Sequence, residues 1–295
     1  MECNLCPRNC NVDRSQKFGF CKVTDKIKVA RAAPHYWEEP CISGEKGSAT
    51  VFFSGCNLKC VFCQNNVISK DCFGKEVSDK ELMIIFDKLI EQGVENLNLV
   101  TPSHYADRLA NILAEFKSPV PVVYNTSSYE KVDTLKKLEG LVDIYLPDLK
   151  YFDNAPAIKY SNAPDYFKIA TEAILEMYRQ VGDIVLNKNG IAEKGIIIRH
   201  MVLPGNISQA YKVFEWVIEN LSEDTYISLM CQYTPYGKAL GIEPINRPVS
   251  SKEYAIAKRK IESLGFNNVY FQKKSSSDTA FIPDFNLQGV DFSEK

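Results

Sequence analysis

The sequence lacks several features that define common classes of protein. No stretch comes near the roughly 20 consecutive apolar residues that a membrane helix needs. No basic run stands out, and 35 Lys and Arg against 37 Asp and Glu leave a formal net charge of −2, so electrostatic binding to nucleic acid has little support. The chain begins MECNLCPRNC, which is typical of neither a secretory signal nor a transit peptide. We therefore expect a cytoplasmic protein that binds neither membranes nor nucleic acid.

Cysteine, by contrast, is abundant. There are ten cysteines, and seven fall into two tight groups within the first 63 residues, with only Cys72 and Cys231 after them. In a cytosolic chain, closely spaced cysteines indicate metal binding more often than disulfides. A secreted disulfide scaffold would spread its cysteines along the chain. The pattern predicts metal centres in the N-terminal part of the chain.

Short apolar runs alternate with amphipathic helical patterns from residue 48 onward, which predicts parallel βα units with right-handed crossovers. Strands are expected at 49–53, 96–100, 120–124, 142–146, 195–202 and 226–230. Helices are expected at 80–92, 106–116, 131–138, 165–181, 208–220 and 251–264. Six such units fit an incomplete (β/α)6 barrel of the TIM type or an open doubly wound sheet, and both gather chemistry at the carboxyl ends of the strands.

We predict an α/β fold with three parts. A small cysteine-rich, metal-binding segment without clear periodicity spans residues 1–46, and the incomplete barrel spans 47–273. A polar, irregular tail spans 274–295, in which residues 281–285 could pack back on the body.

Cys56, Cys60 and Cys63 directly follow the first predicted strand. Three thiolates in this spacing can bind three corners of a [4Fe–4S] cubane and leave the fourth iron open to a small-molecule ligand, whereas ordinary ferredoxin clusters use four cysteines. The alternative is a zinc knuckle, but zinc sites normally need a fourth Cys or His nearby. Neither His35 nor His104 has a suitable spacing, so the sequence favours the open cluster.

This loop resembles the signature of the radical S-adenosylmethionine (SAM) superfamily, C-x₃-C-x₂-C after the first strand with an aromatic residue, here Phe62, before the last cysteine. Residues 53–65 are similar to the branch related to pyruvate formate-lyase activating enzymes. The strongest similarity is to poorly characterised homologues of those enzymes. They share the N-terminal C-x-x-C-P-R-N-C, the segment 37–44 (WEEPCISG) and the segment 145–150 (YLPDLK). The resemblance covers nearly the whole chain.

The resemblance implies a particular chemistry. The amino and carboxylate groups of SAM chelate the open iron, and the reduced cluster passes one electron to the sulfonium. The carbon–sulfur bond breaks to give methionine and a 5′-deoxyadenosyl radical, which abstracts hydrogen from a substrate. The protein positions SAM and excludes competing reactions, while a one-electron donor such as flavodoxin or ferredoxin reduces the cluster.

The resemblance also implies SAM contacts at the ends of later strands. After the second strand the activating enzymes commonly have Gly-Gly-Glu, which binds the SAM amino group. This chain departs from that pattern, and Thr101 and Ser103 could supply oxygens instead, with the role of His104 left open. After the third strand, Asn125 and Thr126 offer side-chain hydrogen bonds in a segment that resembles the family's Thr-Asn-Gly.

Asp148 and Lys150 follow the fourth strand and point to one side of an extended segment. A carboxylate suits the ribose hydroxyls of SAM and a lysine suits its carboxylate, and a structural ion pair is the alternative. After the fifth strand Arg199 and His200 lie on opposite faces, and we expect Arg199 to face the barrel interior. After the sixth strand Gln232 and Tyr233 are expected on the substrate side.

A second cysteine group, C-x₂-C-x₃-C-x₁₀-C, lies ahead of the barrel and comprises Cys3, Cys6, Cys10 and Cys21. Four such cysteines can complete a tetrahedral zinc site or bind a whole cubane. Structural zinc would fold a segment too short to have its own core, whereas an auxiliary [4Fe–4S] cluster could pass electrons or bind substrate. We predict a second metal here, and the choice between zinc and iron–sulfur stays open.

Three functions are compatible with these patterns. The first is an activating enzyme that installs a glycyl radical on a partner enzyme, and the second is a radical SAM enzyme that modifies a small molecule or a peptide. Departures from the activating enzymes at residues 101–104 and 231–235 favour a different substrate. The third is a non-enzymatic iron–sulfur or zinc scaffold or sensor, which would not need SAM-type residues on separate strand ends.

Overall fold

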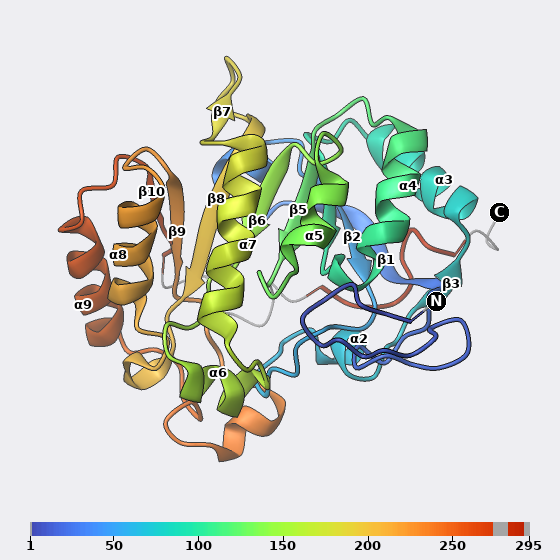
Figure 1. The fold of residues 1–295 in the computed structure, drawn as a ribbon. Helices are drawn as coiled ribbons and strands as arrows, with labels where there is room; N and C mark the ends of the chain where they lie inside the picture. The colour runs from blue at the N-terminus through green and yellow to red at the C-terminus, as the bar shows by residue number, and fades with distance from the viewer. Residues whose placement is uncertain (1, 274–282, 292–295) are drawn as a thin grey trace.

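The computed structural model describes residues 2–273 and 283–291 and contains a ten-stranded, mainly parallel sheet (Figure 1). The strands are β1 (Ile27–His35), β2 (Ser48–Phe53), β3 (Lys75–Val77), β4 (Leu97–Val100), β5 (Val122–Thr126), β6 (Ile144–Pro147), β7 (Val185–Leu186), β8 (Ala192–Met201), β9 (Tyr226–Met230) and β10 (Val269–Phe271). Their order is β10-β9-β8-β6-β5-β4-β2-β1-β3, and β7 pairs with β8. Because β10 and β3 lie at opposite ends of this order, the barrel is open, as the sequence predicts.

The helices alternate with the parallel strands, and in Figure 1 α7, α5 and α4 lie in front of the sheet. They are α1 (Pro40–Ser43), α2 (Asn66–Ser69), α3 (Asp79–Ile90), α4 (Ala106–Phe116), α5 (Val132–Leu135), α6 (Asn154–Ser161), α7 (Tyr166–Val181), α8 (Ala210–Asn220) and α9 (Ser251–Glu262). Short 3₁₀ turns cover Ser103–Tyr105, Lys136–Leu138, Pro204–Asn206 and Gly237–Gly241. All six predicted strands and all six predicted helices are present, with ends shifted by a few residues at most.

The largest addition to the sequence prediction lies in residues 27–43, part of the segment in which the sequence shows no clear periodicity. Here β1 pairs antiparallel with β2, so part of the cysteine-rich segment belongs to the barrel sheet. The following short helix α1 enters the barrel interior. Cys41 and Ile42 of α1 are buried against inward-facing apolar residues of β5, β6 and β8, namely Val123, Ile144, Leu146, Ala192 and Ile197. The inner face of the open sheet is therefore covered by the segment that precedes it in sequence.

The described part of the tail packs along β1. The ring of Phe285 contacts Phe52 edge-on with centroids 5.5 Å apart, and Val290 is fully buried. The backbone N–H of Leu287 donates to the carbonyl of Ala30 at 3.1 Å. Residues 283–285 thus pack back on the body as expected, and 281–282 lie outside the described residues. No helix in the described ranges has both the length and the apolar character that crossing a membrane requires.

We expect Gly289→Ala to destabilise the protein more than Gly93→Ala does. Both glycines have positive φ, +72° and +80°, so either alanine costs about 1 kcal/mol in a left-handed conformation. A Cβ on Gly289 would also overlap the carbonyl oxygen of Ala32, whereas one on Gly93 would meet nothing within 4 Å. Urea unfolding of the two variants compares the losses, and equal losses would contradict the tail packing described here.

Candidate active site

The three cysteines after β2 form a loop in which every sulfur receives a hydrogen bond. Cys56 Sγ accepts from the backbone N–H of Leu58 at 3.3 Å, Cys60 Sγ from Ser161 Oγ at 3.0 Å, and Cys63 Sγ from Ser69 Oγ at 3.2 Å. Donors placed on sulfur favour its thiolate form and tune a bound metal. Burial, helped by the neighbouring Cys60, raises the pKa of the Cys56 thiol to about 12, so iron binding would have to displace its proton at neutral pH.

The N-terminal segment holds this loop in place. Arg8 Nε donates to the carbonyl of Asn57 at 2.7 Å, and its guanidinium lies 3.9 Å from the ring centroid of Phe20. Gly55 has φ +88°, and a Cβ there would lie 2.8 Å from the carbonyl oxygen of Cys21. Glycine is therefore required where the loop and the N-terminal segment meet.

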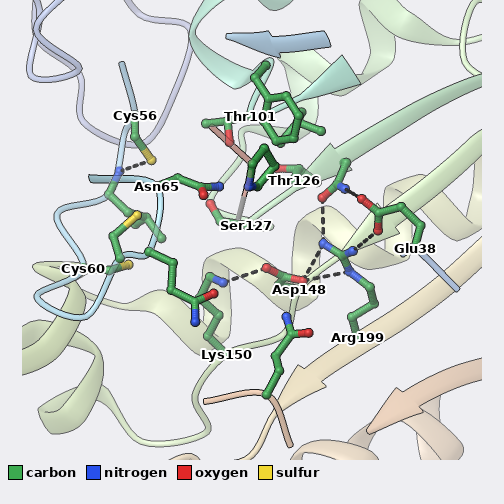
Figure 2. A pocket seen from close by; sticks show the side chains of 18 of the residues that line it. Glu38, Cys56, Cys60, Asn65, Thr101, Thr126, Ser127, Asp148, Lys150 and Arg199 are labelled. Carbon is green, nitrogen blue, oxygen red and sulfur yellow. Dashed lines mark hydrogen bonds and ion pairs between the residues drawn. The ribbon is translucent and has the colours of Figure 1, made fainter. Parts of the chain in front are cut away.

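The three sulfurs face a cavity of about 320 Å³ at the carboxyl ends of the strands (Figure 2). Its volume lies within the roughly 300–1,000 Å³ of small-ligand sites. Six of the predicted SAM contacts line the same cavity: Thr101, Asn125, Thr126, Asp148, Lys150 and Arg199. They come from the ends of β4, β5, β6 and β8, so the structure brings together residues that span a hundred positions of sequence.

A buried ionic network forms one wall of this cavity (Figure 2). Arg199 donates through Nε to Asp148 Oδ1 at 2.9 Å, through Nη1 to Glu38 Oε2 at 2.8 Å, and through Nη2 to Asn125 Oδ1 at 2.7 Å. Lys150 Nζ lies 2.7 Å from Asp148 Oδ2. The four charged side chains are between 11% and 19% exposed, so their interactions are only weakly screened.

The pKa shifts in the network follow from this pairing. Burial acts to raise the pKa of Asp148, but Arg199 and Lys150 outweigh it and the net shift is downward. Burial acts to lower the pKa of Lys150, and Asp148 reverses that effect. Both groups are charged at neutral pH. Asp148 and Lys150 therefore form the structural ion pair that the sequence analysis gave as the alternative to SAM contacts. Both side chains also line the cavity.

Arg199 faces inward and His200 outward, as predicted. His200 is fully buried on the outer face of β8, where its ring lies 5.7 Å from that of Phe214 and its Nδ1 bonds to the carbonyl of Leu149. Burial lowers the pKa of His200 to about 4, so the ring is neutral. The residue belongs to the core between β8 and α8.

Thr101 stands out because it has φ +59°, a left-handed conformation that is rare for a β-branched residue. Its N–H donates to the carbonyl of Asn125 at 2.9 Å, which fixes this conformation at the mouth of the cavity. Strain of this kind concentrates at functional sites.

Two of the predicted SAM contacts do not line this cavity, although one of them lines an adjoining cavity that shares Lys150 and Arg199 with it. Ser103 is buried and donates to the carboxylate of Glu130, because the short 3₁₀ turn after β4 directs it into the core, so the structure corrects this expectation. Phe62 lines a neighbouring cavity of about 200 Å³ and packs edge-on against Tyr233, with centroids 5.6 Å apart. His104 is buried with Nε2 2.8 Å from the carbonyl of Ser54, and burial lowers its pKa to about 3.

Glu38 and Glu130 belong to the site without having been singled out from the sequence. Glu38 lies in the WEEPCISG segment, whose family resemblance was the available signal. Glu130 lies behind Thr126, whose Oγ1 donates to Glu130 Oε1 at 2.5 Å, and is 2% exposed. Burial raises the pKa of Glu130 to about 7. No periodicity or motif in the sequence marks Glu130.

Two of the N-terminal cysteines, Cys10 and Cys21, lie close together around Gly19. A Cβ on Gly19 would lie 3.4 Å from Cys21 Sγ and 3.6 Å from Cys10 Sγ, and Cys10 Sγ accepts the N–H of Phe20 at 3.2 Å. All ten cysteines are free thiols. Across residues 2–273 and 283–291, no group of three or more His, Cys, Asp or Glu side chains is arranged so that it could hold a metal ion, and this holds for both cysteine groups. The second metal stays a prediction.

Comparison with known proteins places these observations in a family. Residues 50–215 match the family model of the radical SAM superfamily. The chain is also 30% identical over 278 residues to an uncharacterized protein of Methanocaldococcus jannaschii, a match that covers 91% of this chain and 76% of that protein.

The solved structures with a similar fold include three proteins whose names are informative. HydG, a maturase of the [FeFe]-hydrogenase, gives a TM-score of 0.51 at 12% identity, over 79% of this chain and 53% of HydG. Methylornithine synthase (PylB) gives a TM-score of 0.50 at 14% sequence identity, over 76% of this chain and 70% of PylB. SuiB of Streptococcus suis, bound to its precursor peptide SuiA, gives a TM-score of 0.50 at 16% sequence identity, over 74% of this chain and 46% of SuiB. This chain therefore spans about half the length of HydG and SuiB, and at these identities the likeness concerns the fold alone.

We expect Glu130 to make stability depend on pH. A carboxyl whose pKa rises from 4.5 to about 7 on folding contributes fully below about pH 4.5, and that contribution is lost as the pH rises through 7. The loss amounts to about 3 kcal/mol. Glu130→Gln should remove this loss. Between pH 5 and pH 8, the free energy of unfolding measured in urea should therefore rise for the variant relative to wild type. The exposed control Glu45→Gln should follow wild type, and an unchanged pH dependence in Glu130→Gln would refute the assignment.

Proposed function

The chain belongs to the radical SAM superfamily, and we propose from this premise that Cys56, Cys60 and Cys63 bind a [4Fe–4S] cluster and that the cavity beside them binds SAM. The observation that carries the proposal is that three hydrogen-bonded sulfurs and the Arg199 network line one cavity. No fourth cysteine occurs among the described residues that line it, which fits a cluster with one open iron. When bound and reduced, the cluster and SAM supply an organic radical that abstracts hydrogen from a substrate.

The residues of the cavity are suited to bind and orient SAM. Lys150 Nζ has three donors and uses one on Asp148, so donors remain for a carboxylate. The two Asp148 oxygens keep lone pairs that can accept from ribose hydroxyls. Asn125 and Thr126 provide polar groups at the end of β5, while Phe52 and Leu58 line the cavity with apolar surface. Because Arg199 holds Asp148 and Asn125, these groups keep their positions before a ligand binds.

For the substrate we favour a small molecule or a single side chain of a peptide. A further cavity of about 280 Å³ adjoins the proposed SAM cavity and shares Arg199 and Gln232 with it, so a group of that size could lie beside SAM. Activation of a glycyl radical enzyme, suggested by the resemblance to activating enzymes, is the alternative. A one-electron donor such as flavodoxin or ferredoxin would act as partner in either case.

We expect Cys60→Ser to abolish SAM cleavage. Serine is a poor iron ligand, so the variant should lose the iron of one cluster, and 5′-deoxyadenosine formed with dithionite and SAM should fall by roughly 100-fold or more, a barrier increase of about 3 kcal/mol. Iron analysis and chromatography under anaerobic conditions measure both. The control Cys231→Ser, a buried cysteine outside the cavity lining, should keep both properties. Full product formation by Cys60→Ser would refute the cluster assignment.

We propose that Cys3, Cys6, Cys10 and Cys21 bind a second metal, either zinc or an auxiliary iron–sulfur cluster. Metal analysis of the reconstituted protein should show one zinc, or about four iron atoms beyond those bound by Cys56, Cys60 and Cys63. Cys6→Ser should lose this second metal and should lower the melting temperature, because the segment has little core of its own. Unchanged metal content in Cys6→Ser would rule the site out, and Cys231→Ser again serves as the control.

A further inference from the structure

The cavity next to the proposed SAM site has a volume of about 280 Å³ and lies between residues 36–40 and the strands β9 and β10. Gln232 and Gln272 form part of the wall common to both cavities. Their positions are fixed, because Gln272 Nε2 donates to Gln232 Oε1 at 2.7 Å and Gln272 Oε1 accepts the N–H of Cys231 at 2.9 Å. A group bound in this second cavity would therefore lie directly beside the SAM cavity.

Glu39 lines the second cavity and is the carboxylate of the site with the weakest pairing. Its side chain is 7% exposed, and its Oε2 accepts no hydrogen bond from any described residue. The guanidinium nitrogen Nη1 of Arg199 is 3.9 Å away and already donates to Glu38 at 2.8 Å. Burial raises the pKa of Glu39, and the hydroxyl of Ser228 on the same cavity wall hydrogen-bonds to its carboxylate. A buried carboxylate oxygen without a donor, as Oε2 is here, is nevertheless costly, so Glu39 either keeps a proton or attracts a cation.

The charges of the site leave room for one more cation. Three carboxylates, on Glu38, Glu39 and Asp148, face two cations, on Arg199 and Lys150. Glu38 and Asp148 are each hydrogen-bonded to a cation, so the excess negative charge falls on Glu39 when all three carboxylates are ionised.

The remaining walls of the second cavity suit an alkyl cation. Tyr36 and Trp37 line it and are 53% and 66% exposed, and the faces of such rings attract ammonium and guanidinium groups. Met230 and Phe271 supply apolar surface for an alkyl stem. The cavity thus combines a buried acidic group, aromatic side chains and apolar walls.

We propose that this second cavity is the substrate subsite and that it binds the substrate through an ammonium or guanidinium group on an alkyl stem, paired with Glu39. The inference rests on the proposed function and specifies the class of substrate that it acts on. A free alkylamine and the lysine or arginine side chain of a peptide share this chemistry.

The test uses the reconstituted protein with SAM bound, under anaerobic conditions. Calorimetric titration compares n-butylguanidinium and n-butylammonium with the neutral analogue n-pentanol, and N-acetyl-lysine methylamide with its side-chain-acetylated form. We expect the cations to bind, the neutral probes to bind at least tenfold more weakly, and Glu39→Gln to lose tenfold or more in cation affinity. The matched control Glu45→Gln, exposed on the same segment, should match wild type. The exposed Trp37→Ala should fold normally and weaken cation binding several-fold.

Stronger binding of the lysine derivative than of the free amine would indicate a peptide substrate, and the reverse a small molecule, and either result supports the subsite. Equal cation binding by wild type and Glu39→Gln, or displacement of the cation by SAM, would overturn it. The SAM affinity and 5′-deoxyadenosine yield of wild type are measured in parallel. If wild type fails to cleave SAM, the proposed function is refuted. Cation binding can still be measured on the SAM-free protein, so the two failures can be told apart.

Discussion

The guanidinium of Arg199 is the interaction on which the proposed site depends. It joins Glu38 from the N-terminal segment, Asn125 from β5 and Asp148 directly after β6, three residues that no local structure would bring together. Removal of one partner from a buried pair typically costs 3–5 kcal/mol, because the other charge is left uncompensated. The network is thus a weak source of net stability and a strong constraint on geometry. It fixes the positions of polar groups at three strand ends before any ligand arrives.

This constraint exists only because the segment before the barrel folds into it. An open sheet leaves its inner face exposed, and α1 covers that face with Cys41 and Ile42. The same insertion carries Glu38 and Glu39, which immediately precede α1, to the mouth of the barrel. One short stretch of chain therefore supplies both the core packing inside the barrel and the charge pairing at its mouth. A change that displaced α1 would both expose the inner face of the sheet and remove the acidic partners of Arg199.

Much of the fold follows from local pattern. Apolar runs and helical periodicity locate the six βα units, and a capping box between Ser78 and Glu81 begins α3. Alternation along β8 correctly separates Arg199 from His200. What the sequence does not reveal are contacts between distant elements. Glu38 lies 161 residues from Arg199.

Turn geometry is equally hidden from sequence patterns. Ser103 shares its segment with Thr101, yet the 3₁₀ turn that follows β4 directs its hydroxyl to Glu130 and away from the cavity. The N-terminal cysteines are recognised from their local spacing, but the contacts of their segment with the distant loop of Cys56, Cys60 and Cys63 are not visible in the sequence. Arg8, within C-P-R-N-C, donates to the backbone of Asn57, and Gly55 lies against the carbonyl of Cys21. A metal that ordered this segment would therefore also order the backbone between Cys56 and Cys60. The N-terminal segment is thus a structural support of the loop that carries Cys56 and Cys60, and the metal that we propose for it would strengthen that support.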